Sequence, residues 1–483
     1  MLQPRFGRVF TLVLASGLSL LTVGVHADDA PVDAARTSNF AADRLVQSLA
    51  PPLRVLSEDV LRQSPEVARA RAEADAAVAR ARQMGSWPDP SAMLTLFALP
   101  PETRVGPQRL AVSVSQPLPW LGKLELRQKE ALWAAVAADA RWQAKRLDLV
   151  TEVRKHFYEL TFVTEQAAII DQERLHLIRH EELARARYAT GYGLQQGVIK
   201  IQAEITRTEQ QRLAVEARRA TLLAELNARR GRPADSEVTG LALPESCTGG
   251  MPADLVEEAW RARPERRALD AEVERRKIQV ELARLGYRPD FTVGLGYTVV
   301  ERRQDDAGRV NPPQGNGDDI FALTAGVRLP VHRQRIAAEL EEALALSAAA
   351  EADRERLRQD LERSIGSLAA RRPLLGDQLR LFDQVLVTQA RETADSAEAA
   401  YSTGELGALE LLDAEHVLFE VELGAARNRL DLAQTCADLE GAVGQSLGAE
   451  MSPPATDPTS ATGQVPAENL SSPGSQEVDH DHR

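Results

Sequence analysis

The 483-residue sequence contains two copies of one pattern. Three pairs of residues lie 213 positions apart, namely Pro117 and Pro330, Gly191 and Gly404, and Gly231 and Gly444. An earlier pair, Pro65 and Pro264, lies 199 positions apart. The second copy therefore has 14 additional residues between Pro264 and Pro330, compared with the stretch from Pro65 to Pro117 in the first copy. A register held over this length indicates a tandem repeat, in which each copy is one structural unit.

Each copy begins with a predicted helix, Pro65–Gly85 or Pro264–Gly286, which is followed by two predicted strands. Apolar residues in these runs alternate with small or polar ones, which is typical of a sheet with two different faces. The strands are expected at Ala92–Leu99 (the least regular run) and Leu110–Ser115 in the first copy, and at Phe291–Val299 and Phe321–Leu329 in the second. The connection Glu301–Asp319 is rich in Asp, Gly, Asn and Pro, so we expect a solvated loop that accounts for the 14 additional residues.

A very long helix is predicted after each pair of strands, at Gly122–Thr190 and at His332–Ser402. Abundant Ala, Leu, Arg and Glu with only 4% aromatic residues favour such helices. A coiled-coil-like seam is formed by Leu147, Val150, Val153, Phe157, Leu160 and Val163. Pro373 predicts a kink in the second long helix. After a glycine-containing turn a return helix is expected, at Leu194–Arg230 and Ala408–Val443, and the short helix and the return helix should stack end to end along the long one.

Four strands of about ten residues are too few to close a sheet within one chain. Inside a membrane, open edges would leave unpaired backbone groups that cost several kcal/mol each. A tilted strand of about ten residues is also long enough to cross a bilayer. We therefore expect closure by three copies of the chain, with the helices continuing the tube. The alternative is a soluble coiled-coil rod with two β-hairpins, exported but free of the membrane.

Residues 1–27 have the pattern of a secretory signal peptide. Arg5 and Arg8 precede the apolar run Val9–Val25, and Val25-His26-Ala27 resembles a cleavage site. An uncleaved membrane anchor is the alternative. Export would place Cys247 and Cys436 in an oxidising compartment, where they are either paired or both free. The net charge of −13 is unfavourable for binding nucleic acid.

The sequence has no H-E-x-x-H zinc motif, no phosphate-binding Walker loop and no paired CxxC. We therefore predict a protein that is not an enzyme and needs no cofactor.

The joint spacing of these features resembles the TolC family of outer-membrane factors over about residues 55–448. The resemblance is carried by the repeat order, by the Tyr-x-x-Gly turns at Tyr188 and Tyr401, and by Ser115-Gln116-Pro117-Leu118 at the end of a strand. It implies a homotrimer with a 12-stranded outer-membrane β-barrel, in contact with membrane lipid and continuous with a long periplasmic α-helical barrel. It also implies a tripartite RND-type efflux system with a periplasmic adaptor and an inner-membrane transporter.

The repeat and the resemblance together divide the chain into six parts. These are the signal peptide 1–27, an N-terminal periplasmic segment 28–61, efflux repeat one 62–231, an inter-repeat equatorial segment 232–258, efflux repeat two 259–448, and a disordered C-terminal tail 449–483.

The resemblance assigns roles to the two turns and to the helix after the second one. Residues at the turns, Tyr188, Gly191, Tyr401 and Gly404, would contact the adaptor. Glu410 and Asp413 lie six and nine positions after Gly404, where the family carries the acidic ring of its periplasmic aperture. Their i, i+3 spacing puts both on one helix face, and such a ring favours cations. The first-repeat equivalents are Gly197 and Lys200, so only one repeat would supply the ring. The alternative is an ordinary solvated helix face.

The exported cargo is the least specified feature. The segment Ser64–Pro90 is most similar to the heavy-metal, CzcC-like branch of the family, which implies metal cations. His480 and His482 in the tail could hold a metal ion loosely. His176 and His180 share a helix face, and a solvated or packed role is favoured over metal binding for them. The alternatives are a duct for organic compounds or type I secretion, and a periplasmic coiled-coil structural or adaptor protein.

Overall fold

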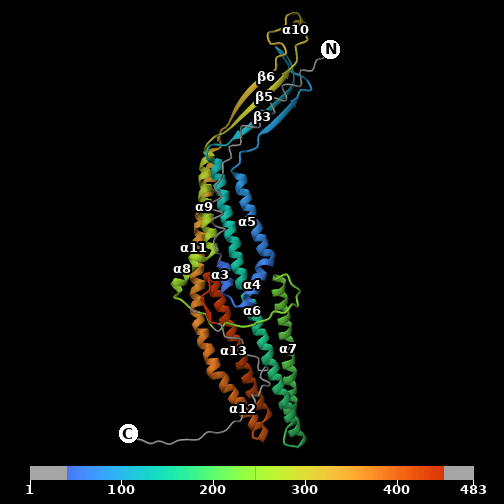
Figure 1. Ribbon diagram of the computed structural model, residues 1–483, viewed down its shortest axis with the longest axis vertical. Helices are drawn as coiled ribbons and strands as arrows, with labels where there is room; N and C mark the ends of the chain where they lie inside the picture. The colour runs from blue at the N-terminus through green and yellow to red at the C-terminus, as the bar shows by residue number, and fades with distance from the viewer. Residues whose placement is uncertain (1–40, 245, 248, 451–483) are drawn as a thin grey trace, which may run out of the picture.

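A computed structural model describes residues 41–244, 246–247 and 249–450. The predicted signal peptide, most of the predicted tail, and His480 and His482 lie outside the described residues. The molecule is elongated, with a β-sheet at one end and two helical turns at the other (Figure 1). Long helices connect the two ends, and shorter helices surround their middle.

The repeat is present as two matching series of elements. The first is α5 (Pro65–Met84), β1 (Ser91–Leu96), β3 (Gly106–Leu118), α6 (Lys123–Ala189) and α7 (Gln195–Arg229). The second is α9 (Pro264–Arg284), β5 (Asp290–Val300), β6 (Ile320–Arg328), α11 (Arg333–Leu381), a π-helical segment (Phe382–Leu386), α12 (Val387–Thr403) and α13 (Ala408–Val443). The remaining elements are α3 (Ala41–Ser48), α4 (Pro51–Gln63), β2 (Glu102–Thr103), β4 (Ser246–Cys247), α8 (Pro252–Ala262), a 3₁₀ turn (Leu285–Tyr287), α10 (Asp306–Val310) and β7 (Ala449–Glu450).

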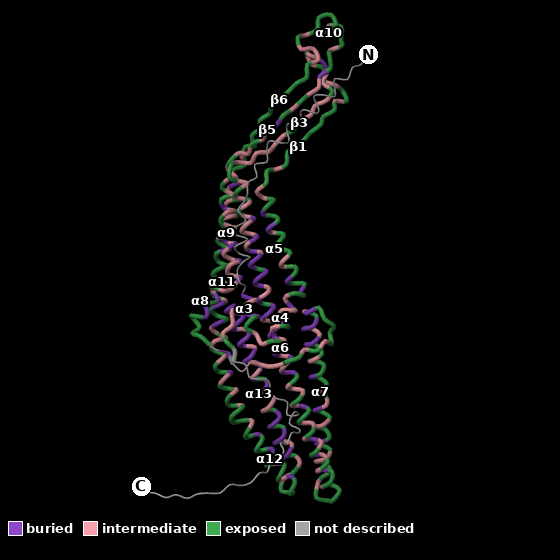
Figure 2. The backbone as a smooth tube through the Cα atoms, in the orientation of Figure 1, coloured by how far each residue is buried: buried purple, intermediate pink, exposed green. Residues whose placement is uncertain are grey.

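The long helix α6 packs against α5 toward the sheet and against α7 toward the turns (Figure 1). The predicted end-to-end stacking is therefore confirmed. All six residues of the predicted seam on α6 are buried, with side chains no more than 3% exposed. Buried positions concentrate in the helical part, whereas most of the sheet is exposed or intermediate in the single chain (Figure 2). The seam therefore buries apolar side chains in the middle part of α6 and stabilises the packing of this helix.

Two local features add to the sequence predictions. Helix α11 continues through Pro373, and a π-helical segment begins nine residues later at Phe382. There the Phe382 ring packs so closely on Gly424 of α13 that a Cβ at Gly424 would lie 3.0 Å from it. The predicted loop Glu301–Asp319 contains the short helix α10, and Asp319 accepts a hydrogen bond from the Tyr297 hydroxyl. This connection is therefore partly ordered by its own contacts.

The main sheet is antiparallel in the order β1-β3-β5-β6, with the short β2 paired to β3. The two repeats join where β3 pairs with β5, for example Val112 with Tyr297. Strands β1 and β6 have no further strand beside them in the described part of the chain. Large apolar side chains on these two strands are exposed, among them Leu96 at 72% and Leu323 at 77%. The sheet of one chain is thus open at both edges and apolar on its surface.

Among the described residues, none of the helices combines the length and the apolar character needed to span a membrane.

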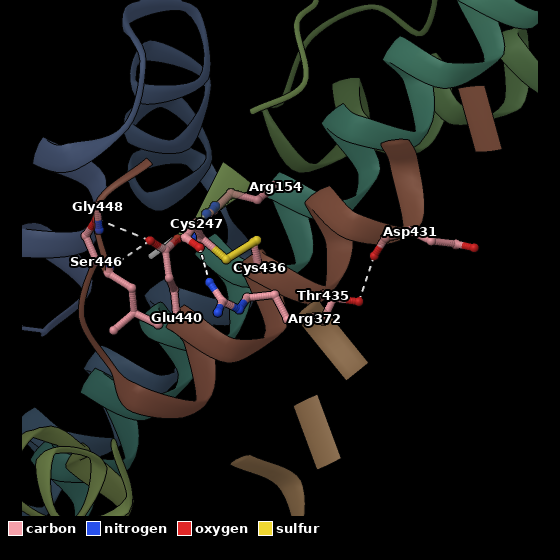
Figure 3. The surroundings of a disulfide bond; sticks show 10 residues. Arg154, Cys247, Arg372, Asp431, Thr435, Cys436, Glu440, Ser446 and Gly448 are labelled. Carbon is pink, nitrogen blue, oxygen red and sulfur yellow. Dashed lines mark hydrogen bonds and ion pairs between the residues drawn. A yellow bond between two sulfur atoms is a disulfide. The ribbon is translucent and has the colours of Figure 1, made fainter. Parts of the chain in front are cut away.

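A disulfide joins Cys247 to Cys436, with the two Cα atoms 5.8 Å apart (Figure 3). The sequence left this pairing open. The bond ties the inter-repeat segment to α13, and the Arg372 guanidinium of α11 donates a hydrogen bond to the Cys247 carbonyl oxygen. Leu375 and Leu432 pack around the two cysteines. The inter-repeat segment is therefore fixed to α11 and α13 of the second repeat.

Candidate functional site at the helical turns

The two glycine-containing turns lie together at the end of the molecule opposite the sheet (Figure 1). Gly191 and Gly404 both have a positive φ, of 80° and 91°, which explains the glycine of the repeated Tyr-x-x-Gly pattern. In the second turn the Gly404 and Glu405 amides donate to the Ala400 carbonyl oxygen and close the end of α12. The turns are thus built by local backbone chemistry that the sequence pattern predicts.

Arg187 connects the two turns. Its guanidinium donates a hydrogen bond to the Tyr401 carbonyl oxygen, and its Cζ lies 4.7 Å from the centre of the Tyr401 ring. It also lies 3.5 Å from the Tyr192 carbonyl oxygen of its own turn. One cation therefore spans both hairpins through a charge-assisted hydrogen bond and a cation–π contact.

The two repeats are not equivalent at the turns. Tyr188 is 47% exposed, whereas Tyr401 is 5% exposed and packs with Ile201 and Leu411. A Cβ at Gly197 of α7 would lie 2.9 Å from the Ala408 Cβ of α13, so the two hairpins meet closely there. In this conformation an external partner would reach Tyr188, Gly191 and Gly404, but not the Tyr401 ring.

Glu410 and Asp413 are both exposed on α13, and neither has a hydrogen-bond or ion-pair partner in the described part of the chain. Leu411, between them in sequence, is fully buried, so the two carboxylates lie on the face directed away from the rest of the chain. Glu410 occupies the first turn of α13, and a Cβ at Gly407 would lie 2.5 Å from its Oε2 atom. The positive end of the helix dipole stabilises a carboxylate at this position.

A buried polar contact joins the two repeats further from the turns. His180 of α6 is 2% exposed and Glu415 of α13 is 6% exposed, and the His180 Nε2 atom lies 2.8 Å from Glu415 Oε1. The Nδ1 atom of His176 lies 3.4 Å from the second carboxylate oxygen. Burial opposes the Glu415 charge, but the hydrogen bonds and charges of His180 and His176 outweigh it and lower the pKa of Glu415.

The sequence pointed to the pair His176 and His180, but it did not reveal Glu415 or Arg187. Glu415 is 235 residues from His180, and only the packing register of α6 on α13 brings them together. One signal was available, because Glu415 lies on the apolar stripe that includes Leu411 and Leu418, where a carboxylate needs a partner. Within the described residues no group of three or more His, Cys, Asp or Glu side chains has the arrangement of a metal site.

The sequence model of the family described as "Outer membrane efflux protein" matches residues 56–232 and 255–445. A comparison with curated proteins found no match.

Several solved structures have the same fold. The outer membrane protein VceC of Vibrio cholerae is 20% identical, with a TM-score of 0.69, over 84% of this chain and 99% of that one. CusC, described by its transmembrane channel formation, is 16% identical, with a TM-score of 0.67, over 82% of this chain and 93% of that one. The open state of the MtrE outer membrane channel of Neisseria gonorrhoeae is 18% identical, with a TM-score of 0.66, over 82% and 90%.

Proposed function

Because the chain belongs to the outer membrane efflux protein family, we propose that three copies form the exit duct of a tripartite efflux system. The family consists of outer-membrane channel proteins and not of enzymes. The protein is therefore an outer-membrane channel with a large periplasmic helical part. To this family membership we add a proposed trimer, its partners, a periplasmic aperture and a cargo.

The observation that carries the proposal is the open sheet above the long helices. Strands β1 and β6 each have an unpaired edge and an exposed apolar surface. Pairing β6 of one copy with β1 of the next would satisfy both edges, and three copies would give a 12-stranded barrel wide enough for a lumen. The repeats at 62–231 and 259–448 would then continue the barrel as a helical tube, with segments 28–61 and 232–258 around its middle.

The trimer can be tested by the mass of the detergent-solubilised protein. We expect multi-angle light scattering, after subtraction of the detergent, to give three times the mass of one mature chain. Replacing Leu323 by Pro should abolish the trimer, because Pro removes a ladder hydrogen bond and cannot be accommodated in the middle of a sheet. Leu344→Ala, at an exposed site on α11 outside the sheet, is the control and should remain trimeric. A monodisperse wild-type monomer would contradict the proposal.

The periplasmic adaptor would bind at the turns, and the inner-membrane transporter would supply the energy. Tyr188, Gly191 and Gly404 are accessible in the single chain, and Tyr401 would support the second turn from beneath. Glu410 and Asp413 would line the aperture, since both lie unpartnered on the outward face of α13. Three-fold symmetry would gather these carboxylates around the axis, which favours cations over anions and supports heavy-metal cations as cargo.

The aperture can be tested by replacing both carboxylates together, as Glu410→Gln with Asp413→Asn. We expect wild-type channels in planar bilayers to be cation-selective in KCl and ZnCl₂ gradients, and the double variant to lose most of this selectivity and conduct more. Exposed carboxylates elsewhere on α13 provide the control, and Glu420→Gln should leave the reversal potential unchanged. An unchanged reversal potential in the double variant would reject the aperture, and anion selectivity of the wild type would reject the metal cargo.

A further inference from the structure

The contact between His180 and Glu415 joins helices from different repeats, and the duct function proposed above does not use it. Both side chains are almost fully buried, and the Nε2–Oε1 distance is 2.8 Å. The second Glu415 oxygen lies 3.4 Å from His176, which is one helical turn from His180. The buried Glu415 carboxylate therefore has an imidazole beside each of its two oxygens.

Further charged groups face this contact from α6 and α7. Glu173 lies one turn before His176 on α6, and its Oε2 atom is buried without a hydrogen-bond partner in the described part of the chain. Glu204 and Arg207 lie on α7, with a 3.6 Å ion pair between them. Burial is the largest cause of a raised pKa for Glu173, followed by the charges of Glu204 and Glu415, and together they raise it to about 7.

We propose that Glu173, His176, His180 and Glu415 form a proton-dependent latch that holds α13 against α6 in mildly acidic medium and releases it as the pH rises through neutrality. The immediate effect is the strength of the α6–α13 contact; its effect on conduction rests on the proposed duct.

The direction follows from which groups carry charge. In mildly acidic medium Glu173 is neutral, and the Glu415 carboxylate is held by the side chains of His180 and His176. As the pH rises through about 7, Glu173 becomes a third carboxylate beside Glu204 and Glu415, with Arg207 as the cation facing them. The pKa of Glu173 is about 7 in the closed contact and 4.5 ordinarily. The contribution of Glu173 to the contact is therefore fully present below pH 4.5 and is lost progressively as the pH rises to about 7. The pKa of Glu415 is lowered, so the Glu415 carboxylate stabilises the contact at pH values above its ordinary pKa.

Hydrogen exchange of the detergent-solubilised protein tests the latch directly. We follow peptides from residues 408–420 at pH 6 and pH 8 and correct for intrinsic exchange rates. If Glu173 recovers its ordinary pKa in the open form, the corrected exchange should be about tenfold faster at pH 8 than at pH 6. Glu173→Gln should remove most of this ratio by keeping α13 protected at pH 8. His180→Gln retains a hydrogen-bond donor but removes the imidazole charge that helps to lower the pKa of Glu415, so it should weaken protection at pH 6.

His416→Gln is the matched control, because His416 is exposed and pairs with Glu420 of its own helix at 3.1 Å. This variant should keep the full tenfold ratio. A wild-type ratio within about twofold of unity, or a full ratio in Glu173→Gln, would overturn the latch.

Channel recordings at the same two pH values separate the latch from the duct. A larger open fraction at pH 8 that is absent in Glu173→Gln supports both. Normal conduction with pH-independent exchange rejects the latch alone, and pH-dependent exchange in a protein that never conducts rejects the duct alone.

Discussion

Replacing Glu440 by Ala is expected to destabilise the protein by about 3–5 kcal/mol, because it leaves the Arg154 guanidinium buried without an anion. Both side chains are 3% exposed, and they form an ion pair between α6 and α13 beside the disulfide (Figure 3). The Nε and Nη1 atoms of Arg154 have no hydrogen-bond acceptor among the described residues. Loss of Glu440 would therefore remove the carboxylate that pairs with this charge. Denaturant unfolding of the detergent-solubilised protein measures the effect.

The reciprocal variant, Arg154→Met, should cost about half as much. Without Arg154, the Glu440 carboxylate retains the Leu447 amide at 2.8 Å and the Ser446 hydroxyl at 3.2 Å. These two donors stabilise a buried carboxylate, whereas Nε and Nη1 of Arg154 have no acceptor in the part of the chain that the structure describes.

The neighbouring pair of Lys155 and Asp438 is the control, since it joins the same two helices at 3.0 Å with side chains 40% and 35% exposed. Lys155→Met should cost less than about 1 kcal/mol, because solvent screens exposed pairs. Equal losses in Glu440→Ala and Lys155→Met would show that burial of the Arg154 pair adds nothing to stability.

The fold was largely predictable because its two periodicities are repeated. Apolar residues alternate with small or polar ones along Phe291–Val299, which fits only a strand whose two faces differ. The predicted run lies within β5. The apolar residues from Leu147 to Val163 recur every three or four positions, which fits only a helix, and α6 contains all of them. The offset of 199 residues at Pro65 and of 213 residues from Pro117 onward then related the elements of one copy to those of the other.

The site was less predictable because its contacts depend on how helices from different repeats are aligned. The Tyr-x-x-Gly turns follow from local backbone chemistry, and their glycines have the expected positive φ. The burial of Tyr401 and the exposure of Tyr188 do not follow, since both tyrosines occupy the same position in the repeat. A shift of α13 along α6 by one turn, about 5.4 Å, would separate Glu415 from His180 without changing either helix pattern.

In the duct proposed above, Arg187→Ala is expected to shift the proposed aperture strongly toward its open state. The variant removes the hydrogen bond to the Tyr401 carbonyl oxygen and the cation–π contact with its ring, which together join the two hairpins. A charge-assisted hydrogen bond and a cation–π contact contribute about 2 kcal/mol together, which corresponds to a roughly 30-fold change in the ratio of open to closed channels. The open fraction in single-channel recordings measures this ratio.

Arg185→Ala is the matched control for this effect. Arg185 has the same charge two residues earlier on α6, is 66% exposed, and pairs at 2.6 Å with Glu181 of its own helix, so its loss breaks no contact between hairpins. Arg187→Lys distinguishes charge from geometry, because Lys retains the charge but lacks the planar fork that reaches the Tyr401 and Tyr192 carbonyl oxygens together. If the Arg187 contacts hold the hairpins closed, Lys should give an intermediate open fraction. Equal open fractions in Arg185→Ala and Arg187→Ala would instead assign the effect to net charge at the turns and reject a specific bridge.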